Sequence, residues 1–175
     1  MKTALVLITL FITSIAAAQV NWMTMDEALA AQQKEPRKIL LKSYTEWCPN
    51  CKWMDKYSFS KPDIAAYINK NYYPVAFDAE GTEIVHYKGA TYDNPLKKNN
   101  KRAAHEFASF MRIYEYPTLV FFDEKGVIIN PVPGKLDAKK LEIYITMLKD
   151  ETYKGINTGA KWAAYQKNFK YKLQG

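Results

Sequence analysis

The sequence is poor in cysteine, and this scarcity excludes several classes of protein. Its 175 residues include 2 cysteines, and both lie in the stretch Cys48-Pro49-Asn50-Cys51. A multi-disulfide scaffold is therefore excluded. The chain also has only 7 glycines and 8 prolines, too few for a collagenous or low-complexity protein. Apolar residues make up 48 % and charged residues 25 %, which is typical of one packed domain with at most a small appendage.

Motifs for cofactors and for nucleic acid are also missing. The chain has no Gly-rich phosphate loop, so we expect no bound cofactor. The formal net charge of +7 falls well short of that of a basic tail that binds nucleic acid. We therefore expect no nucleic-acid partner.

The N-terminus holds a hydrophobic run that is too short to span a membrane. Residues 1–18 combine Lys2, an apolar run from Ala4 to Ile15 and three alanines before Gln19. This is the layout of a secretory signal peptide, because the run is well below the roughly 20 residues that a spanning helix needs. We expect cleavage after Ala18, no stable membrane insertion, and a periplasmic or secreted mature protein.

Hydrophobic periodicity predicts alternating helices and strands in the mature chain. The predicted helices cover residues 25–34, 48–57, 62–69, 103–114 and 137–149, and the predicted strands cover 39–44, 73–78, 116–122 and 127–130. The polar stretch 79–102 is predicted to be an inserted loop or small hairpin. Residues 151–175 form a basic extension, in which Trp162, Tyr165 and Phe169 make one apolar stripe. We expect a C-terminal amphipathic helix docked on the body, with binding to a membrane surface or an acidic partner as the alternative.

The cysteine pair predicts redox chemistry. At the first turn of a helix, free N–H groups and the helix dipole stabilise a thiolate. In this arrangement Cys48 is the exposed nucleophile, and Cys51 is close enough to displace a substrate from the mixed disulfide. A zinc site is disfavoured because His86 and His105 are 19 residues apart. We expect no metal, and we expect the histidines to be solvated rather than catalytic.

Several further segments carry a resemblance to a known family. Trp47-Cys48-Pro49-Asn50-Cys51-Lys52 follows an apolar strand, and Val75-Ala76-Phe77-Asp78, Tyr116-Pro117-Thr118-Leu119 and Gly134 follow in order. Together they resemble the thioredoxin superfamily, and in particular the secreted thioredoxin-like domains of the DsbD C-terminal type. The resemblance implies an α/β fold for residues 19–150, a three-layer α/β/α sandwich with a mixed central sheet. It also implies that Pro117 is a cis-proline, that Tyr116 pairs with an extended substrate, and that Trp47 shields the active-site turn.

One position departs from the pattern of the family. Six residues before the first cysteine, where the family commonly has a buried aspartate, this chain has Lys42. A buried lysine is costly unless it is paired or neutral. Three arrangements are therefore open: Lys42 extends to solvent, it pairs with Glu46 or Asp78, or it favours the Cys51 thiolate directly.

Taken together, the sequence predicts an exported thiol-disulfide oxidoreductase that exchanges with protein thiols and disulfides. Pro49 and Asn50 place no charge between the cysteines, which favours a reductase that is recharged by a membrane thiol donor. A disulfide oxidase or isomerase and a non-enzymatic binding module are the alternatives. We expect residues 79–102 to lie near the active site and to restrict which proteins reach Cys48.

Overall fold

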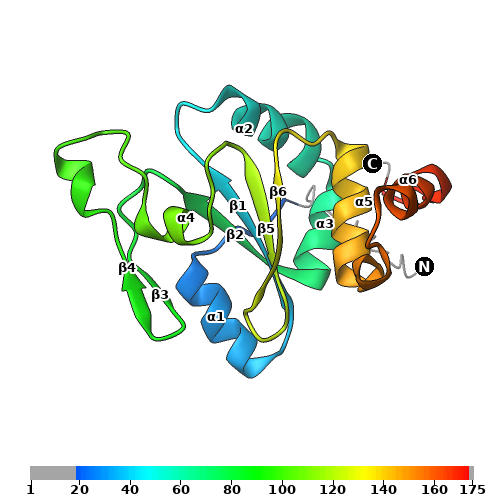
Figure 1. The fold of residues 1–175 in the computed structure, drawn as a ribbon, viewed down its shortest axis with the longest axis horizontal. Helices are drawn as coiled ribbons and strands as arrows, with labels where there is room; N and C mark the ends of the chain where they lie inside the picture. The colour runs from blue at the N-terminus through cyan, green and yellow to red at the C-terminus, as the bar shows by residue number, and fades with distance from the viewer. Residues whose placement is uncertain (1–18, 174–175) are drawn as a thin grey trace, which may run out of the picture.

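The computed structural model describes residues 19–173, which form a sheet covered by helices on both faces (Figure 1). The predicted signal peptide, residues 1–18, lies outside the described residues. Four strands form the central sheet in the order β2-β1-β5-β6. Strand β1 (Lys38–Tyr44) runs parallel to β2 (Tyr72–Asp78) and antiparallel to β5 (Thr118–Phe122), which pairs antiparallel with β6 (Ile128–Pro133). The sheet is therefore mixed, as predicted.

The helices complete a three-layer sandwich. In Figure 1, α1 (Met25–Lys34) and α4 (Glu106–Phe110) lie on one side of the sheet, and α3 (Pro62–Asn71) and α5 (Ala138–Lys149) lie on the other. Helix α2 (Pro49–Met54) follows β1 and continues into a π-helical turn, η1 (Asp55–Phe59). The predicted α/β fold is confirmed.

Side chains that alternate in direction along the strands form a hydrophobic core on each face of the sheet. On β1, Ile39 and Leu41 join the cluster that includes α1 and α4, whereas Leu40 joins the cluster that includes α3 and α5. Side chains of successive strand residues point to opposite faces. A strand buried on both faces therefore has a continuous apolar run, which is the pattern of Ile39-Leu40-Leu41.

Residues 79–102 contain a hairpin that is anchored in the core. Strands β3 (Val85–Tyr87) and β4 (Ala90–Tyr92) pair antiparallel, and a 3-10 turn, η2 (Pro95–Lys98), follows. The hairpin turn needs two positive φ angles, which Lys88 (50°) and Gly89 (79°) provide. Val85 and Tyr87 are buried, and the Tyr87 hydroxyl donates to the Gly126 carbonyl at 2.7 Å. The hairpin therefore contributes to the hydrophobic core.

Helix α4 is shorter than the predicted helix over residues 103–114. His105 is its N-cap: Nδ1 accepts from the Phe107 N–H at 3.0 Å, and Nε2 lies 2.6 Å from the Glu83 carbonyl oxygen. Arg112 has a left-handed φ of 56°, which a continuing helix does not allow. The expectation of two solvated histidines is wrong for His105, which is fully buried, because the cap places its ring inside the molecule. His86 is exposed and pairs with Asp26.

The C-terminal extension packs on the outer side of α5. Its helix α6 (Gly159–Asn168) follows a 3-10 turn, η3 (Thr152–Gly155), and the Trp162 and Tyr144 rings lie 5.4 Å apart. Buried Glu142 accepts from the backbone N–H groups of Lys172 and Leu173. The apolar stripe of α6 thus contacts the body, as expected for a docked amphipathic helix.

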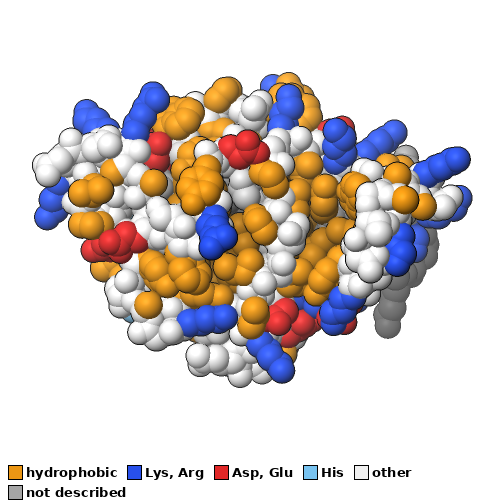
Figure 2. Space-filling view, in the orientation of Figure 1, with side chains coloured by type: hydrophobic (Ala, Val, Ile, Leu, Met, Phe, Trp, Pro, Cys, Tyr) orange, Lys and Arg blue, Asp and Glu red, His pale blue; other side chains and the backbone are white. Residues whose placement is uncertain are grey.

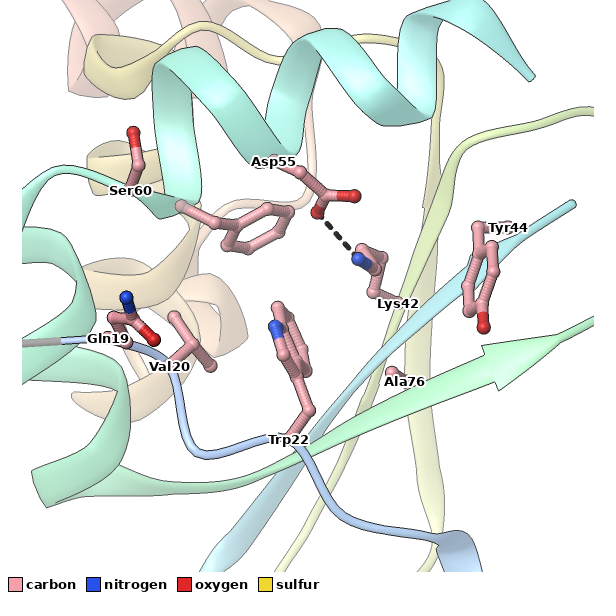
Figure 3. Close-up of a pocket in the computed structure, with 9 residues that line it drawn as sticks. Gln19, Val20, Trp22, Lys42, Tyr44, Asp55, Ser60 and Ala76 are labelled. Atoms are coloured by element: carbon pink, nitrogen blue, oxygen red, sulfur yellow. Dashed lines mark hydrogen bonds and ion pairs between the residues drawn. The ribbon is translucent and has the colours of Figure 1, made fainter. Parts of the chain in front are cut away.

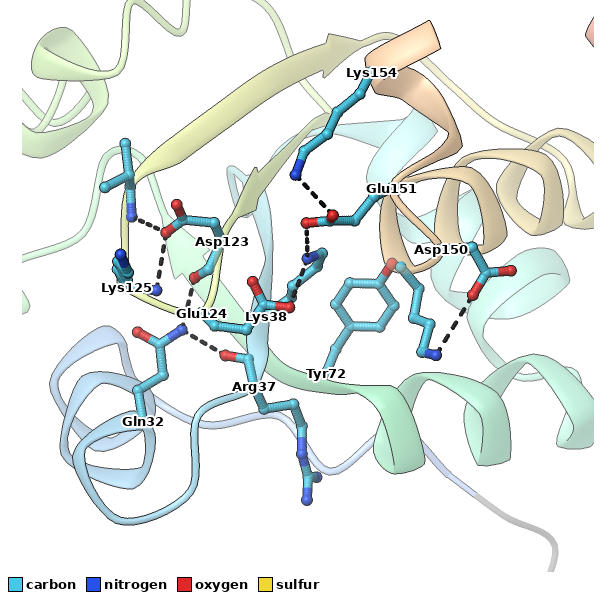
Figure 4. A network of polar contacts seen from close by, with 12 residues as sticks. Gln32, Arg37, Lys38, Tyr72, Asp123, Glu124, Lys125, Asp150, Glu151 and Lys154 are labelled. Atoms are coloured by element: carbon cyan, nitrogen blue, oxygen red, sulfur yellow. Dashed lines mark hydrogen bonds and ion pairs between the residues drawn. The ribbon is translucent and has the colours of Figure 1, made fainter.

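A charged network ties the start of the extension to the sheet. Buried Lys38 on β1 donates to Glu124 at 2.6 Å and to Glu151 at 3.4 Å, and Lys154 donates to Glu151 at 2.7 Å (Figure 4). The carboxylates satisfy a lysine ammonium that would otherwise be buried without a partner.

Among the helices of residues 19–173, none is long and apolar enough to cross a membrane.

Candidate active site

The two cysteines form a disulfide at the start of α2. Cys48 is the N-cap of this helix and Cys51 lies in its first turn, with their Cα atoms 5.3 Å apart. The Cys51 backbone N–H donates to Cys48 Sγ at 3.1 Å. Pro49 occupies the first helical turn, where its missing N–H removes no helix hydrogen bond. An N–H group aimed at Sγ stabilises negative charge on that sulfur, so the arrangement suits thiol-disulfide exchange.

The expectation of an exposed Cys48 is wrong for the disulfide form. Cys48 and Cys51 are each 2 % exposed, whereas Pro49 and Asn50 between them are exposed. The reason is the capping geometry, which turns Cys48 Sγ back over the first turn of α2 and away from solvent. A partner must therefore approach the sulfur along the surface formed by the neighbouring side chains.

Tyr116 and Pro117 directly precede strand β5. The peptide bond between them is cis, and Pro117 is buried. The Pro117 carbonyl accepts from the Gly134 N–H at 2.8 Å, and Gly134 has a φ of 91°. Tyr116 is half-buried, and burial raises the pKa of its hydroxyl, with smaller contributions from Glu80 and Asp78.

Trp47 is held on the surface beside Cys48. It is 47 % exposed, so it is not a core tryptophan. Its Nε1–H donates to Glu80 Oε2 at 2.9 Å, and its ring meets the Tyr116 ring edge-on at 6.3 Å. The guanidinium of Arg102 stands 4.7 Å from the Trp47 ring centroid. Trp47 thus has a fixed orientation between the cysteine turn and the segment 79–102.

The structure gives Lys42 a partner that the sequence did not indicate. Lys42 Nζ lies 2.6 Å from Asp55 Oδ1, at the start of η1 (Figure 3). Among the ion pairs of residues 19–173, Lys42 pairs with neither Glu46 nor Asp78. Lys42 is 4 % exposed, so the expectation that it extends to solvent is also wrong. Its side chain lies on the sheet face of Leu40, where η1 brings Asp55 over it. Asp55 is one helical turn after Cys51, which places this ion pair under the helix that carries the cysteines.

Aromatic rings surround the Lys42 ammonium in a cleft of about 510 Å³. Nζ lies 4.6 Å from the Trp22 ring centroid, 5.1 Å from that of Tyr44 and 5.6 Å from that of Phe59. These ring faces attract a cation, so they add to the pairing with Asp55. The strand position six residues before Cys48, where the family resemblance implies a buried aspartate, therefore carries a compensated positive charge here.

The remaining predicted residues make fewer contacts. Glu46, Pro49 and Asn50 are all exposed at the cysteine turn. Over residues 19–173 no group of three or more histidine, cysteine or acidic side chains is arranged to hold a metal ion. Sequence reasoning missed Asp55 and Glu80 and did not predict that Arg102 stacks on Trp47, since the pattern of a segment does not reveal which distant side chain it contacts.

Comparison with known proteins shows which family the domain around this site belongs to. A family model described as a thioredoxin-like domain matches residues 25–149. The chain belongs to this family. The thioredoxin-like domain is also similar to the thiol:disulfide interchange protein DsbD of Photorhabdus laumondii, with 23 % identity over 130 residues, 73 % of this chain and 19 % of that protein. DsbD 2 of Pseudomonas aeruginosa is 43 % identical over 42 residues, 24 % of this chain and 7 % of that protein.

The DsbD relatives are much longer than this chain, and the solved structures share its fold at low sequence identity. The chain spans about a fifth of the length of the two DsbD proteins that it matches over most of its own length. A thioredoxin-fold protein from Helicobacter pylori aligns with a TM-score of 0.56 at 17 % identity, covering 81 % of this chain and 96 % of that one. A thioredoxin from Thermus thermophilus gives 0.54 at 20 % identity, covering 82 % and 93 %. These structures establish the fold of the thioredoxin-like domain.

Proposed function

We propose that this chain is an exported thiol-disulfide oxidoreductase that reduces protein disulfides. The observation that carries the proposal is the Cys48–Cys51 pair at the first turn of α2, with the Cys51 N–H directed at Cys48 Sγ. A helix start that donates to the sulfur favours the thiolate, which is the reactive form in exchange. The family match and the similarity to DsbD proteins support the same chemistry.

The reaction transfers two electrons from the protein to its substrate. In the reduced protein, the Cys48 thiolate attacks one sulfur of a substrate disulfide, and the other substrate sulfur leaves as a thiolate. The Cys51 thiolate then attacks Cys48 Sγ, which releases the second substrate sulfur and forms the Cys48–Cys51 disulfide. Water protonates the two substrate thiolates. A separate dithiol donor must then reduce the Cys48–Cys51 disulfide, and it is itself oxidised to a disulfide.

The cysteine turn supports reduction as the direction, and the relatives support the choice of partner. Pro49 and Asn50 are uncharged, so they add no extra stabilisation to the Cys48 thiolate, and a strongly stabilised thiolate is typical of oxidants. The relatives are named thiol:disulfide interchange proteins, which supports exchange with a thiol partner, and we assign that role to a membrane thiol donor. Export rests on residues 1–18, which have the layout of a signal peptide.

The residues around the disulfide have proposed roles in binding. Tyr116, next to the cis peptide bond, offers its backbone to an extended substrate, and Trp47 forms the wall beside Cys48. The ion pair of Lys42 and Asp55 lies one helical turn from Cys51 and modulates its environment.

Cysteine variants test the proposal. Reduced wild-type protein should reduce insulin disulfides, Cys48→Ser should abolish the activity, and Cys51→Ser should accumulate mixed disulfides with exported proteins. The direction follows from equilibration in glutathione buffers of graded potential, where a reductase remains oxidised in buffers that already reduce an oxidase. If neither cysteine affects exchange, the chain is a binding module with an incidental disulfide.

A further inference from the structure

Both ends of the segment 79–102 contact the same side chain beside the disulfide. Glu80, near its start, accepts the Trp47 indole N–H at 2.9 Å. Arg102, at its end, stacks on the Trp47 ring with its guanidinium carbon 4.7 Å from the centroid. Glu80 is only 7 % exposed, whereas Arg102 is exposed. The buried contact fixes the indole, and the exposed contact places a cation on the surface one residue from Cys48.

The positive charge of Arg102 has no acidic partner in the described chain. None of the ion pairs within residues 19–173 includes Arg102. The Trp47 ring that carries Arg102 on its face donates its indole N–H to Glu80 and not to Arg102's own neighbours in the loop. A guanidinium stacked on an aromatic face keeps its N–H edge available, and that edge matches a carboxylate in a bidentate pair.

The surrounding loop adds positive charge of the same kind. Between Asp93 and Glu106 the chain carries four cations and no carboxylate, namely Lys97, Lys98, Lys101 and Arg102. The Lys97 ammonium donates to the Lys101 carbonyl at 2.6 Å, which closes the loop on itself. Figure 2 shows lysine and arginine side chains projecting from the region of this loop, which lies at the left of the view. The loop that leads to Arg102, the residue stacked on Trp47, therefore carries a basic rim.

We propose that Arg102, supported by the basic rim, selects protein substrates that carry an aspartate or glutamate close to the reactive disulfide. A substrate strand that pairs with the Tyr116 backbone passes beside Trp47, because the Trp47 and Tyr116 rings meet edge-on. A carboxylate on that strand pairs with the free edge of the Arg102 guanidinium while the guanidinium stays on Trp47. Charge complementarity identifies the partner as an acidic segment of a protein. This inference rests on the proposed function and adds a substrate class to it.

The test uses peptide disulfides that differ only beside the cysteine. Three peptides carry glutamate, glutamine or lysine as the flanking residue, and the second-order rate constant of their reduction by the reduced protein is measured at low and high salt. Wild type should reduce the glutamate peptide roughly two- to fivefold faster than the glutamine peptide, the range that an exposed ion pair supplies. High salt should shrink this ratio, and Arg102→Gln should bring it close to one.

A matched arginine at the other end of β1 provides the control. Arg37 also stacks on an aromatic ring, with its guanidinium carbon 4.8 Å from the Tyr73 centroid, but it lies before Lys38, whereas the cysteines follow Tyr44. Arg37→Gln removes the same charge and should keep the wild-type ratio. Arg102→Glu should shift the preference toward the lysine peptide.

The possible results separate this inference from the proposed function. If Arg102→Gln slows all three peptides by the same factor, Arg102 acts only by holding Trp47, and selection of acidic substrates is refuted. An unchanged glutamate-to-glutamine ratio in Arg102→Gln refutes it as well. If the wild type exchanges with none of the peptides and does not reduce insulin, the proposed function fails.

Discussion

Lys42 and Asp55 form an ion pair of unequal burial beneath the helix that carries the cysteines. Nζ and Oδ1 are 2.6 Å apart, and the side chain of Lys42 is 6 % exposed while that of Asp55 is 47 % exposed. Water can therefore solvate the Asp55 carboxylate even when Lys42 is replaced. The buried Lys42 ammonium, in contrast, is stabilised by that carboxylate and by the rings of Trp22, Tyr44 and Phe59. The two partners should respond differently to substitution.

Removing the acid should cost more stability than removing the base. Asp55→Asn leaves a buried ammonium without its counter-charge, and we expect it to lower the free energy of unfolding by about 1–3 kcal/mol. Lys42→Met removes the buried charge and leaves a carboxylate that water can reach, so the loss should be smaller. Urea unfolding of the oxidised protein measures both. Glu35→Gln, which breaks an exposed pair with Arg37, is the control and should change stability by less than about 1 kcal/mol. A larger loss in Lys42→Met than in Asp55→Asn would contradict this account.

Tyr87 should make the fold sensitive to alkaline pH. Burial raises the pKa of Tyr87 from 10.0 to about 12, with a smaller contribution from Asp123. Between about pH 10 and 12 the unfolded chain therefore loses this proton while the folded chain keeps it, so stability must fall as pH rises through this window. Tyr87→Phe should show a shallower fall than wild type when denaturant midpoints are measured across the window.

The same variant separates the titration from the hydrogen bond. At neutral pH, Tyr87→Phe loses the bond to the Gly126 carbonyl and should be less stable by about 1 kcal/mol. Tyr171→Phe changes an exposed tyrosine and should leave the stability at neutral pH as in wild type. Parallel alkaline slopes for wild type and Tyr87→Phe would show that Tyr87 does not titrate in this range.

Loss of Trp162 should release the C-terminal extension without unfolding the domain. Trp162 packs on Tyr144 and Tyr165, outside the sheet. Trp162→Ala should therefore speed tryptic cleavage after Lys161 and Lys167 several-fold, because local opening needs less free energy than global unfolding. The free energy of global unfolding should fall far less than in Phe121→Ala, where a fully buried ring in β5 is worth about 3–5 kcal/mol.

The exposed neighbour Gln166 provides the control for this helix. Gln166→Ala keeps the aromatic contacts of α6 and should be cleaved at the wild-type rate. If Trp162→Ala unfolds the domain as severely as Phe121→Ala, the extension is part of the cooperative core instead of a docked appendage.

Features that depend on neighbouring residues could be predicted from the sequence. The capping box of Thr24 and Glu27 marks the start of α1, where both of its hydrogen bonds form. The apolar runs place β1, β2 and β5 within one or two residues of their bounds. Cys48, Pro49 and Cys51 predict a helix start that carries a disulfide. These features are local, because periodicity, caps and turn residues act over a few positions along the chain.

Contacts between side chains that are distant in the sequence could not be predicted and depend on the folded arrangement. Asp55 reaches Lys42 because η1 passes over β1, and Glu80 and Arg102 reach Trp47 because the chain returns to the cysteine turn at both ends of residues 79–102. The burial of His105 and of Cys48 likewise follows from where their caps turn the side chains. The residues next to a charged side chain in the sequence do not indicate which opposite charge it will contact. Its partner is set by the packing of helices on the sheet and by strand register, which bring the two charges together.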